Sequence, residues 1–266
     1  MLRMSYDERA ELFDADLAAA IAAPDSDHAL ITLLSRPRLD GAERVLIIAA
    51  LGESGTGPEG SAAVRAQFSL ATSELATGAK HTQANWRDNA CAAVIALARR
   101  DGPAATDVCL AAVASANPSV RDYGLDALAV EGDDRGWDTM VAFISDILNR
   151  KTISTTRWNE LIKAVEYLAR QAGHGSIHAE QLITLLRAHW AKLASPPPIK
   201  EKRGYPTYIH TRPATRLEEL WPGIQPHGPP ADMIDLPRLH TPTGLWQPRN
   251  QPPTGPTGPQ APPRSA

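Results

Sequence analysis

The chain has 266 residues and a formal net charge of −3, which allows one large domain or two small ones and excludes a nucleic-acid-binding polycation. Its two cysteines, Cys91 and Cys109, lack C-x-x-C spacing, so neither a disulfide framework nor a zinc site is expected. No apolar run approaches the ~18–20 residues that span a bilayer, and the charged start MLRMSYDERAEL is unlike a signal peptide, so we expect a cytoplasmic location.

Charge and proline divide the chain into two parts. Residues 1–194 hold 19 basic and 25 acidic residues, a net charge of −6, whereas residues 195–266 have a net charge of +3 and 18 of the 23 prolines. This division predicts a helical body over 1–194 and a Pro-rich, mostly disordered tail over 195–266. The opposite charges favour contact between tail and body. The Ala- and Arg-rich composition is typical of a high-GC bacterium.

Apolar residues recur with helical spacing along the body, and no segment has the alternation of a convincing strand. In the first predicted helix, Leu12, Ala15, Ala19 and Ala22 form the apolar stripe, and in the third Val45, Ile48, Ala49 and Leu51 face inward. The glycine-rich segment 52–60 lacks the Lys-Ser/Thr pair of a phosphate loop and is expected to be a loop. The predicted helices span 5–23, 28–35, 40–53, 58–77, 86–100, 103–116, 117–131, 138–149, 157–171 and 177–193.

The stretch 117–133, NPSVRDYGLDALAVEGD, carries the clearest pattern. Asn117-Pro118 is a helix start, because proline fits a first turn whose amides have no intrahelical partner. Gly132 stands where a helix can end with a left-handed residue. One apolar face is formed by Val120, Gly124, Ala127, Leu128 and Val130.

This stretch resembles the second helix of a bacterial HEAT repeat in four features: Pro118, Val120-Arg121, Ala127-Leu128 and the exit 131–133. Weaker copies occur 77 residues earlier, around Arg44, and 34 residues earlier, around Arg87. The second copy aligns almost equally well in two registers. The offset of 77 residues corresponds to two units of about 38, which is close to the ~40-residue period of HEAT-type repeats. The resemblance implies an all-α, HEAT-like superhelix of the armadillo type, in which stacked helix pairs bury a continuous core.

Arginine recurs in these copies as Arg44, Arg87, Arg121 and, 36 residues further on, Arg157. The resemblance implies that such arginines bond a carbonyl or carboxylate of the neighbouring repeat, forming an internal ladder. The alternative is a row of cations that binds carboxylates or phosphates of a partner. The nearby Asp88, Asp122 and Asp126 favour the ladder.

Two tryptophans, Trp221 and Trp246, interrupt the Pro-rich tail. Residues 215–221 have the pattern of a short helix. Aromatic residues dominate many interfaces, so both tryptophans are candidate partner-binding residues, although the same pattern also fits hydrophobic residues that merely decorate a linker.

The patterns of catalytic and cofactor sites are missing, so we expect no enzyme, cofactor or metal. His174 and His178 are four residues apart, but the glycines around them indicate a loop, and a third metal ligand is not evident. The basic clusters 99–100, 150–151 and 200–203 are short, and the acidic body argues against nucleic-acid binding.

The resulting hypothesis is a non-enzymatic scaffold or adaptor that binds a protein partner on the repeat face, through the tail, or both. Two alternatives remain from the sequence: a HEAT-like enzyme of the lyase or DNA glycosylase type, and an immunity-type inhibitor of one enzyme. The enzyme alternative predicts a basic, aromatic-lined groove with a buried aspartate.

Overall fold

The computed structural model describes residues 6–54, 57–172, 177–195, 213–230 and 233–234. Within these ranges the chain is helical and contains no strand. None of the helices found there is long and apolar enough to cross a membrane. The α-helices are α1 (Tyr6–Ala22), α2 (Ser26–Leu34), α3 (Gly41–Ser54), α4 (Pro58–Thr77), α5 (Gln83–Asp101), α6 (Thr106–Val113), α7 (Pro118–Glu131), α8 (Trp137–Asn149), α9 (Thr155–Ala172), α10 (Ile177–Ala188), α11 (Trp190–Ala194) and α12 (Pro213–Leu220).

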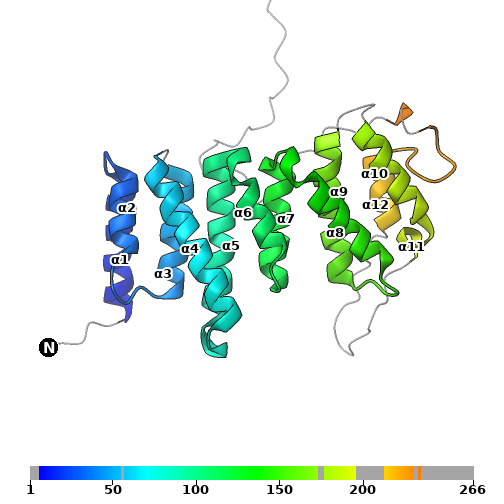
Figure 1. Ribbon diagram of the computed structural model, residues 1–266. Coiled ribbons are helices and arrows are strands. Elements are labelled where there is room, and N and C mark those ends of the chain that lie inside the picture. The colour runs from blue at the N-terminus through cyan, green and yellow to red at the C-terminus, as the bar shows by residue number, and fades with distance from the viewer. Residues whose placement is uncertain (1–5, 55–56, 173–176, 196–212, 231–232, 235–266) are drawn as a thin grey trace, which may run out of the picture.

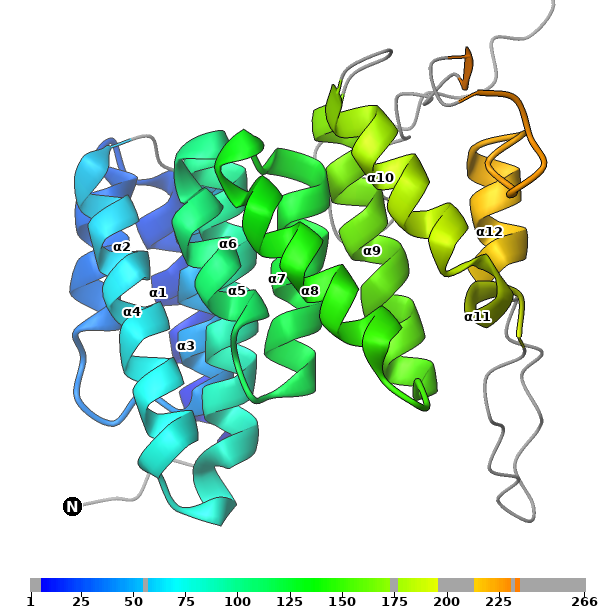
Figure 2. The same ribbon diagram turned by 45° about the vertical axis from the view of Figure 1, so that its right-hand side comes forward.

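The helices stand side by side in chain order along one row, with α1 and α2 at one end and α11 and α12 at the other (Figures 1 and 2). Helices α3, α5, α7 and α9 contact one another in succession and form one layer. Helices α4, α6 and α8 each pack against the helix that follows in the chain, and α2 packs against α3. The first layer therefore consists of the segments in which the sequence places the recurring arginines.

The start of α7 follows from its sequence. The Asn117 side chain accepts hydrogen bonds from the amides of Ser119 (3.0 Å) and Val120 (3.4 Å), and Pro118 occupies the first turn. The end differs from the prediction, because Gly132 is extended (φ −60°, ψ 149°) rather than left-handed. Its amide still bonds the Leu128 carbonyl, so the helix closes without a positive φ.

The buried faces of α1 and α3 differ from those predicted. In α1, Leu12, Ala15, Ala19 and Ala22 are exposed, because α2 and α3 cover the opposite side, where Phe13 and Ala20 are buried. In α3, Ile47 and Ala50 join the predicted Ile48 and Leu51 in the core, whereas Val45 and Ala49 remain half-buried. The apolar positions of both helices extend beyond one face, so spacing alone does not choose the inward one.

Helices α6 and α7 approach each other closely at Gly124. A Cβ atom there would lie 2.8 Å from the Ala112 Cβ and 3.0 Å from the Cys109 carbonyl oxygen. Replacing Gly124 with alanine should therefore lower the free energy of unfolding by about 1–2 kcal/mol, because overpacking outweighs the gain in helix propensity. Urea denaturation measures the change. Ser73→Ala, at an exposed position of α4, is the matched control and should be neutral or slightly stabilising; an equally stable Gly124→Ala protein would contradict the close crossing.

The predicted helix 177–193 is broken in the structure. Helix α10 ends at Ala188, and α11 begins at Trp190 after the non-helical His189 (φ −107°, ψ 12°). The bend places the Lys192 ammonium where it donates to the Leu148 and Arg150 carbonyls at the end of α8. These bonds satisfy acceptors that a helix end leaves free.

Part of the proline-rich tail packs on the body. The short helix predicted at 215–221 is present as α12, which contacts α9 and α11. Leu217, Trp221 and Ile224 are fully buried. The Arg187 guanidinium of α10 donates to the carbonyls of Gly223 (3.1 Å), Ile224 (3.1 Å) and Pro229 (2.6 Å). The described core thus continues past residue 194, the boundary predicted between body and tail.

Candidate functional site: a groove along α1, α3, α5 and α7

The four recurring arginines lie near the starts of α3, α5, α7 and α9. Arg121 and Arg157 meet at Glu160, with Nε of Arg121 3.1 Å and Nη1 of Arg157 2.7 Å from its carboxylate oxygens. Arg121 also donates to the Ser115 and Ala116 carbonyls, both at 2.9 Å. Glu160 is fully buried, so both arginines neutralise an interior charge. The bond from Arg121 to the next helix of the layer is the kind of contact that the ladder interpretation predicts.

Arg44 and Arg87 are bound less firmly. Arg44 makes a long hydrogen bond of 3.4 Å to the Gln67 side chain. Arg87 pairs with its neighbour Asp88 at 2.8 Å, and this bond, together with the charge of Asp88, raises the pKa of the guanidinium. Arg87 also lines the groove described next, and the other three arginines are not among its lining residues.

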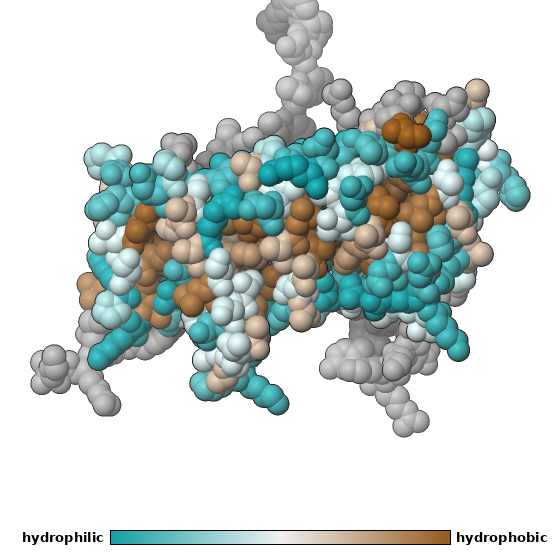
Figure 3. Space-filling view, in the orientation of Figure 1, coloured by the Kyte–Doolittle hydropathy of each residue, from teal (hydrophilic) through white to brown (hydrophobic). Residues whose placement is uncertain are grey.

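The groove runs across α1, α3, α5 and α7 and has a volume of about 950 Å³. Most of its lining is apolar, and the alanines of α3 and α5 in it leave space that larger side chains would fill. In the space-filling view, hydrophobic residues form a band along the row between hydrophilic residues (Figure 3). We call this hollow the α1–α7 groove; its apolar lining includes Leu17, Ile21, Val45, Ala49, Ala92 and Ile95.

Charged pairs stand at the two ends of the groove. At one end the Arg99 guanidinium of α5 lies 2.9 Å from the Glu53 carboxylate of α3. Close backbone packing fixes this end, because a Cβ on Gly52 would lie 2.6 Å from the Ala96 Cα. The other end holds Arg87 and Asp88, 12 residues before Arg99 in α5, which corresponds to about 18 Å along the helix.

Beside the groove, Lys163 of α9 joins two carboxylates of α7. Its ammonium lies 2.7 Å from Asp122 and 2.9 Å from Asp126. Burial opposes the charged form of Lys163, but the two hydrogen bonds raise its pKa overall. Burial raises the pKa of Asp126, against the effect of Lys163. These bonds hold α9 against α7 at the edge of the groove.

The groove offers surface rather than reactive groups. Cys91 lies in its floor, and burial raises the pKa of the thiol to about 12, so the thiol is protonated at neutral pH. The groove arginines are paired with carboxylates, and Tyr123 is the one aromatic residue in the lining. The α1–α7 groove is less basic and less aromatic than the groove that the lyase or glycosylase alternative requires.

The structure describes one of the two histidines that the sequence places four residues apart. The His178 ring lies tilted against Trp137, with ring centroids 4.3 Å apart, and His174 lies outside the described residues. Across the described ranges, no group of three His, Cys, Asp or Glu residues is arranged to hold a metal ion.

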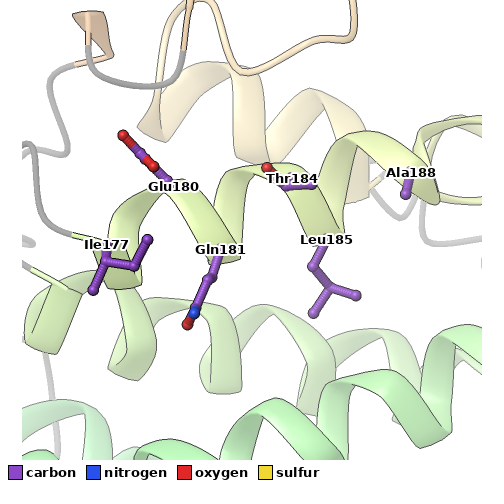
Figure 4. Close-up of a pocket in the computed structure, with 6 residues that line it drawn as sticks. All are labelled: Ile177, Glu180, Gln181, Thr184, Leu185 and Ala188. Carbon is purple, nitrogen blue, oxygen red and sulfur yellow. The ribbon is translucent and has the colours of Figure 1, made fainter.

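A second hollow, of about 500 Å³, lies along α10 (Figure 4). Ile177, Gln181 and Leu185 point to one side of the helix, and Glu180 points to the other. All of its lining residues come from this single helix, so it lacks the opposing walls of the α1–α7 groove.

The structure describes one of the two tail tryptophans that the sequence suggests as partner-binding residues. Trp221 is fully buried inside the fold, so the intact structure does not offer it to a partner. Trp246 lies outside the described residues.

A buried ion pair joins Asp27 of α2 to Arg100 of α5, and the sequence patterns do not predict it. The Arg100 side chain is 2% exposed and donates to both Asp27 oxygens, to the Leu51 carbonyl at 2.6 Å and to the Gly57 carbonyl. Asp27 also accepts the Gly57 amide at 3.0 Å. Gly57 is thereby fastened, and 73 residues separate the two charges in the chain. Of the segment 52–60 expected to be a loop, residues 52–54 instead belong to α3 and residues 58–60 to α4. Asp27 lies in the first turn of α2, two residues after the cap Asp25, but a local pattern does not reveal so distant a partner.

No family model, curated protein or solved structure matches this chain.

Proposed function

We propose that this protein is a HEAT-like helical-repeat scaffold whose α1–α7 groove binds a segment of a partner protein. The observation that carries the proposal is the groove itself, with its largely apolar lining and a charged pair at each end. Concave, mostly apolar sites with a few placed polar groups are typical of binding surfaces. The succession of contacts α3 to α5 to α7 to α9 supports the helical-repeat part of the proposal.

The groove also contains apolar surface that folding has left uncovered. Leu46 of α3 is 45% exposed and Ile21 of α1 is 44% exposed, and both line the hollow. A partner that covers them gains about 25 cal/mol for each Å² of apolar surface removed from water.

Leu46→Glu should prevent capture of the partner, because a bound segment would bury an unpaired carboxylate against its apolar side. Tagged full-length protein, Leu46→Glu and Leu70→Glu are used as baits in lysate of the native host, with nuclease treatment. Leu70 lies on α4, is 41% exposed and does not line the groove, so it is the matched control.

We expect the wild type and Leu70→Glu to capture a protein whether or not nuclease is added. Leu46→Glu should capture at least roughly tenfold less of that protein, which corresponds to a loss in binding free energy of about 1.4 kcal/mol or more. Capture that is equal for all three baits, or that ends with nuclease treatment, would contradict binding in the groove.

A further inference from the structure

The edge of the α1–α7 groove between α5 and α7 carries more negative than positive charge, from Asp88 of α5 and from Asp122 and Asp126 of α7. Tyr123 lines this edge. Burial raises the pKa of Tyr123, and the negative charges of Asp122, Asp126 and Asp88 raise it further. Three carboxylates therefore act on one side chain of the groove wall.

Two cations face these three carboxylates. Arg87 pairs with Asp88, and Lys163 is shared between Asp122 and Asp126. The Asp122 side chain is 42% exposed and that of its partner Lys163 is 23% exposed, whereas Asp88 and Arg87 are similarly exposed, at 52% and 41%. A ligand therefore meets the Asp122 carboxylate before the Lys163 ammonium, and meets the Asp88 carboxylate beside the Arg87 guanidinium. The body as a whole, residues 1–194, has a net charge of −6 and attracts cationic ligands.

The helical walls of the groove favour a helical ligand over an extended one. Its walls are helices whose interior backbone N–H and C=O groups already bond within the helix, so they cannot pair with an extended backbone. A helical ligand brings its own satisfied backbone and needs only side-chain contacts. The length of about 18 Å along α5 corresponds to roughly 12 helical residues.

Building on the proposed function, we propose that the α1–α7 groove binds a basic amphipathic helix of a partner protein. The apolar face of the helix covers Leu46, Ile21 and the alanine floor. Lysines or arginines on its flank lie between α5 and α7 and pair with Asp88 of α5 and Asp122 of α7.

The probes are three fluorescein-labelled peptides of 14 residues with leucine at helical spacing. They carry lysine, glutamine or glutamate at the same flanking positions. Fluorescence anisotropy measures their Kd for the full-length protein at low and moderate salt, and for Leu46→Glu, Ile21→Glu and the control Leu70→Glu. Asp88→Asn and Asp122→Asn remove the charges that the proposal uses, and circular dichroism checks that each variant is folded.

We expect the lysine peptide to bind at least roughly tenfold more tightly than the glutamate peptide, with the glutamine peptide between them. Leu46→Glu and Ile21→Glu should each weaken the glutamine peptide at least roughly tenfold, whereas Leu70→Glu should leave all three unchanged. The double variant Asp88→Asn with Asp122→Asn should lower the lysine-to-glutamate ratio to about threefold or less and leave the glutamine peptide unchanged.

Two other outcomes have separate meanings. Equal or tighter binding of the glutamate peptide, still lost in Leu46→Glu, would overturn the basic helix and leave groove binding in place. Binding of all peptides that is insensitive to both Leu46→Glu and Ile21→Glu would overturn the groove itself.

Discussion

Asp27→Ala should lower the free energy of unfolding by about 3–5 kcal/mol, because it leaves the guanidinium of Arg100 buried without a counter-charge. The Arg100 side chain is 2% exposed and that of Asp27 is 10% exposed, so water replaces the lost carboxylate poorly. The variant also leaves the Gly57 amide without its acceptor. Urea denaturation followed by circular dichroism measures the change.

Asp16→Ala is the matched control, since Asp16 also pairs with an arginine, Arg36, but both side chains are about half exposed. Exposed pairs contribute roughly 0–1 kcal/mol, so this variant should be near the wild type. In Asp27→Ala with Arg100→Met, the charge is removed together with its partner, and part of the lost stability should return. A loss below about 1 kcal/mol in Asp27→Ala would mean that the pair does not fasten α2 to α5.

Trp221→Ala should destabilise the protein by about 3–5 kcal/mol, the usual cost of emptying a buried tryptophan site. Trp221 is completely buried, as are Leu217 and Ile224, so neither water nor a partner can reach it in the intact structure. The loss should appear first as local opening of α12 from α9 and α11, because the main contacts of α12 with the described body lie at this end of the row. Hydrogen exchange of 213–230 and of α11 measures that opening.

Met233→Ala provides the control from the same part of the chain, because Met233 is 69% exposed. Its stability and exchange should match the wild type. If Trp221→Ala also left both unchanged, the packing of the tail on α9 and α11 would be contradicted, and Trp221 would again be a candidate partner anchor.

Local chemistry explains why the positions of most helices could be predicted. The helix over 58–77 begins at Pro58 and ends before Gly78, as predicted, because a proline start and a glycine end act within a few residues. The start of α7 at Asn117 and Pro118 has the same origin. Such signals do not depend on distant parts of the chain.

The groove was beyond local prediction because it depends on which helix faces which neighbour. Val45 and Ala49 have the same apolar character as Ile47 and Ala50, and only the positions of α1, α5 and α7 leave the first two half-buried. Arg87 and Arg121 occupy matching places in the sequence pattern, yet one lines the groove and the other bonds the buried Glu160. The difference comes from Glu160, 39 residues after Arg121, which the pattern around the arginines does not contain.

The packing of α12 on α9 and α11 also has a consequence for synthesis of the chain. Trp221 follows Ala194, the end of α11, by 27 residues. At about 5–20 residues per second, the ribosome adds these residues in roughly 1–5 s. During that interval the apolar surface that Trp221 later covers is exposed. A nascent chain stalled just after α11 should therefore bind hydrophobic-surface chaperones more strongly than one stalled after Ile234 has emerged.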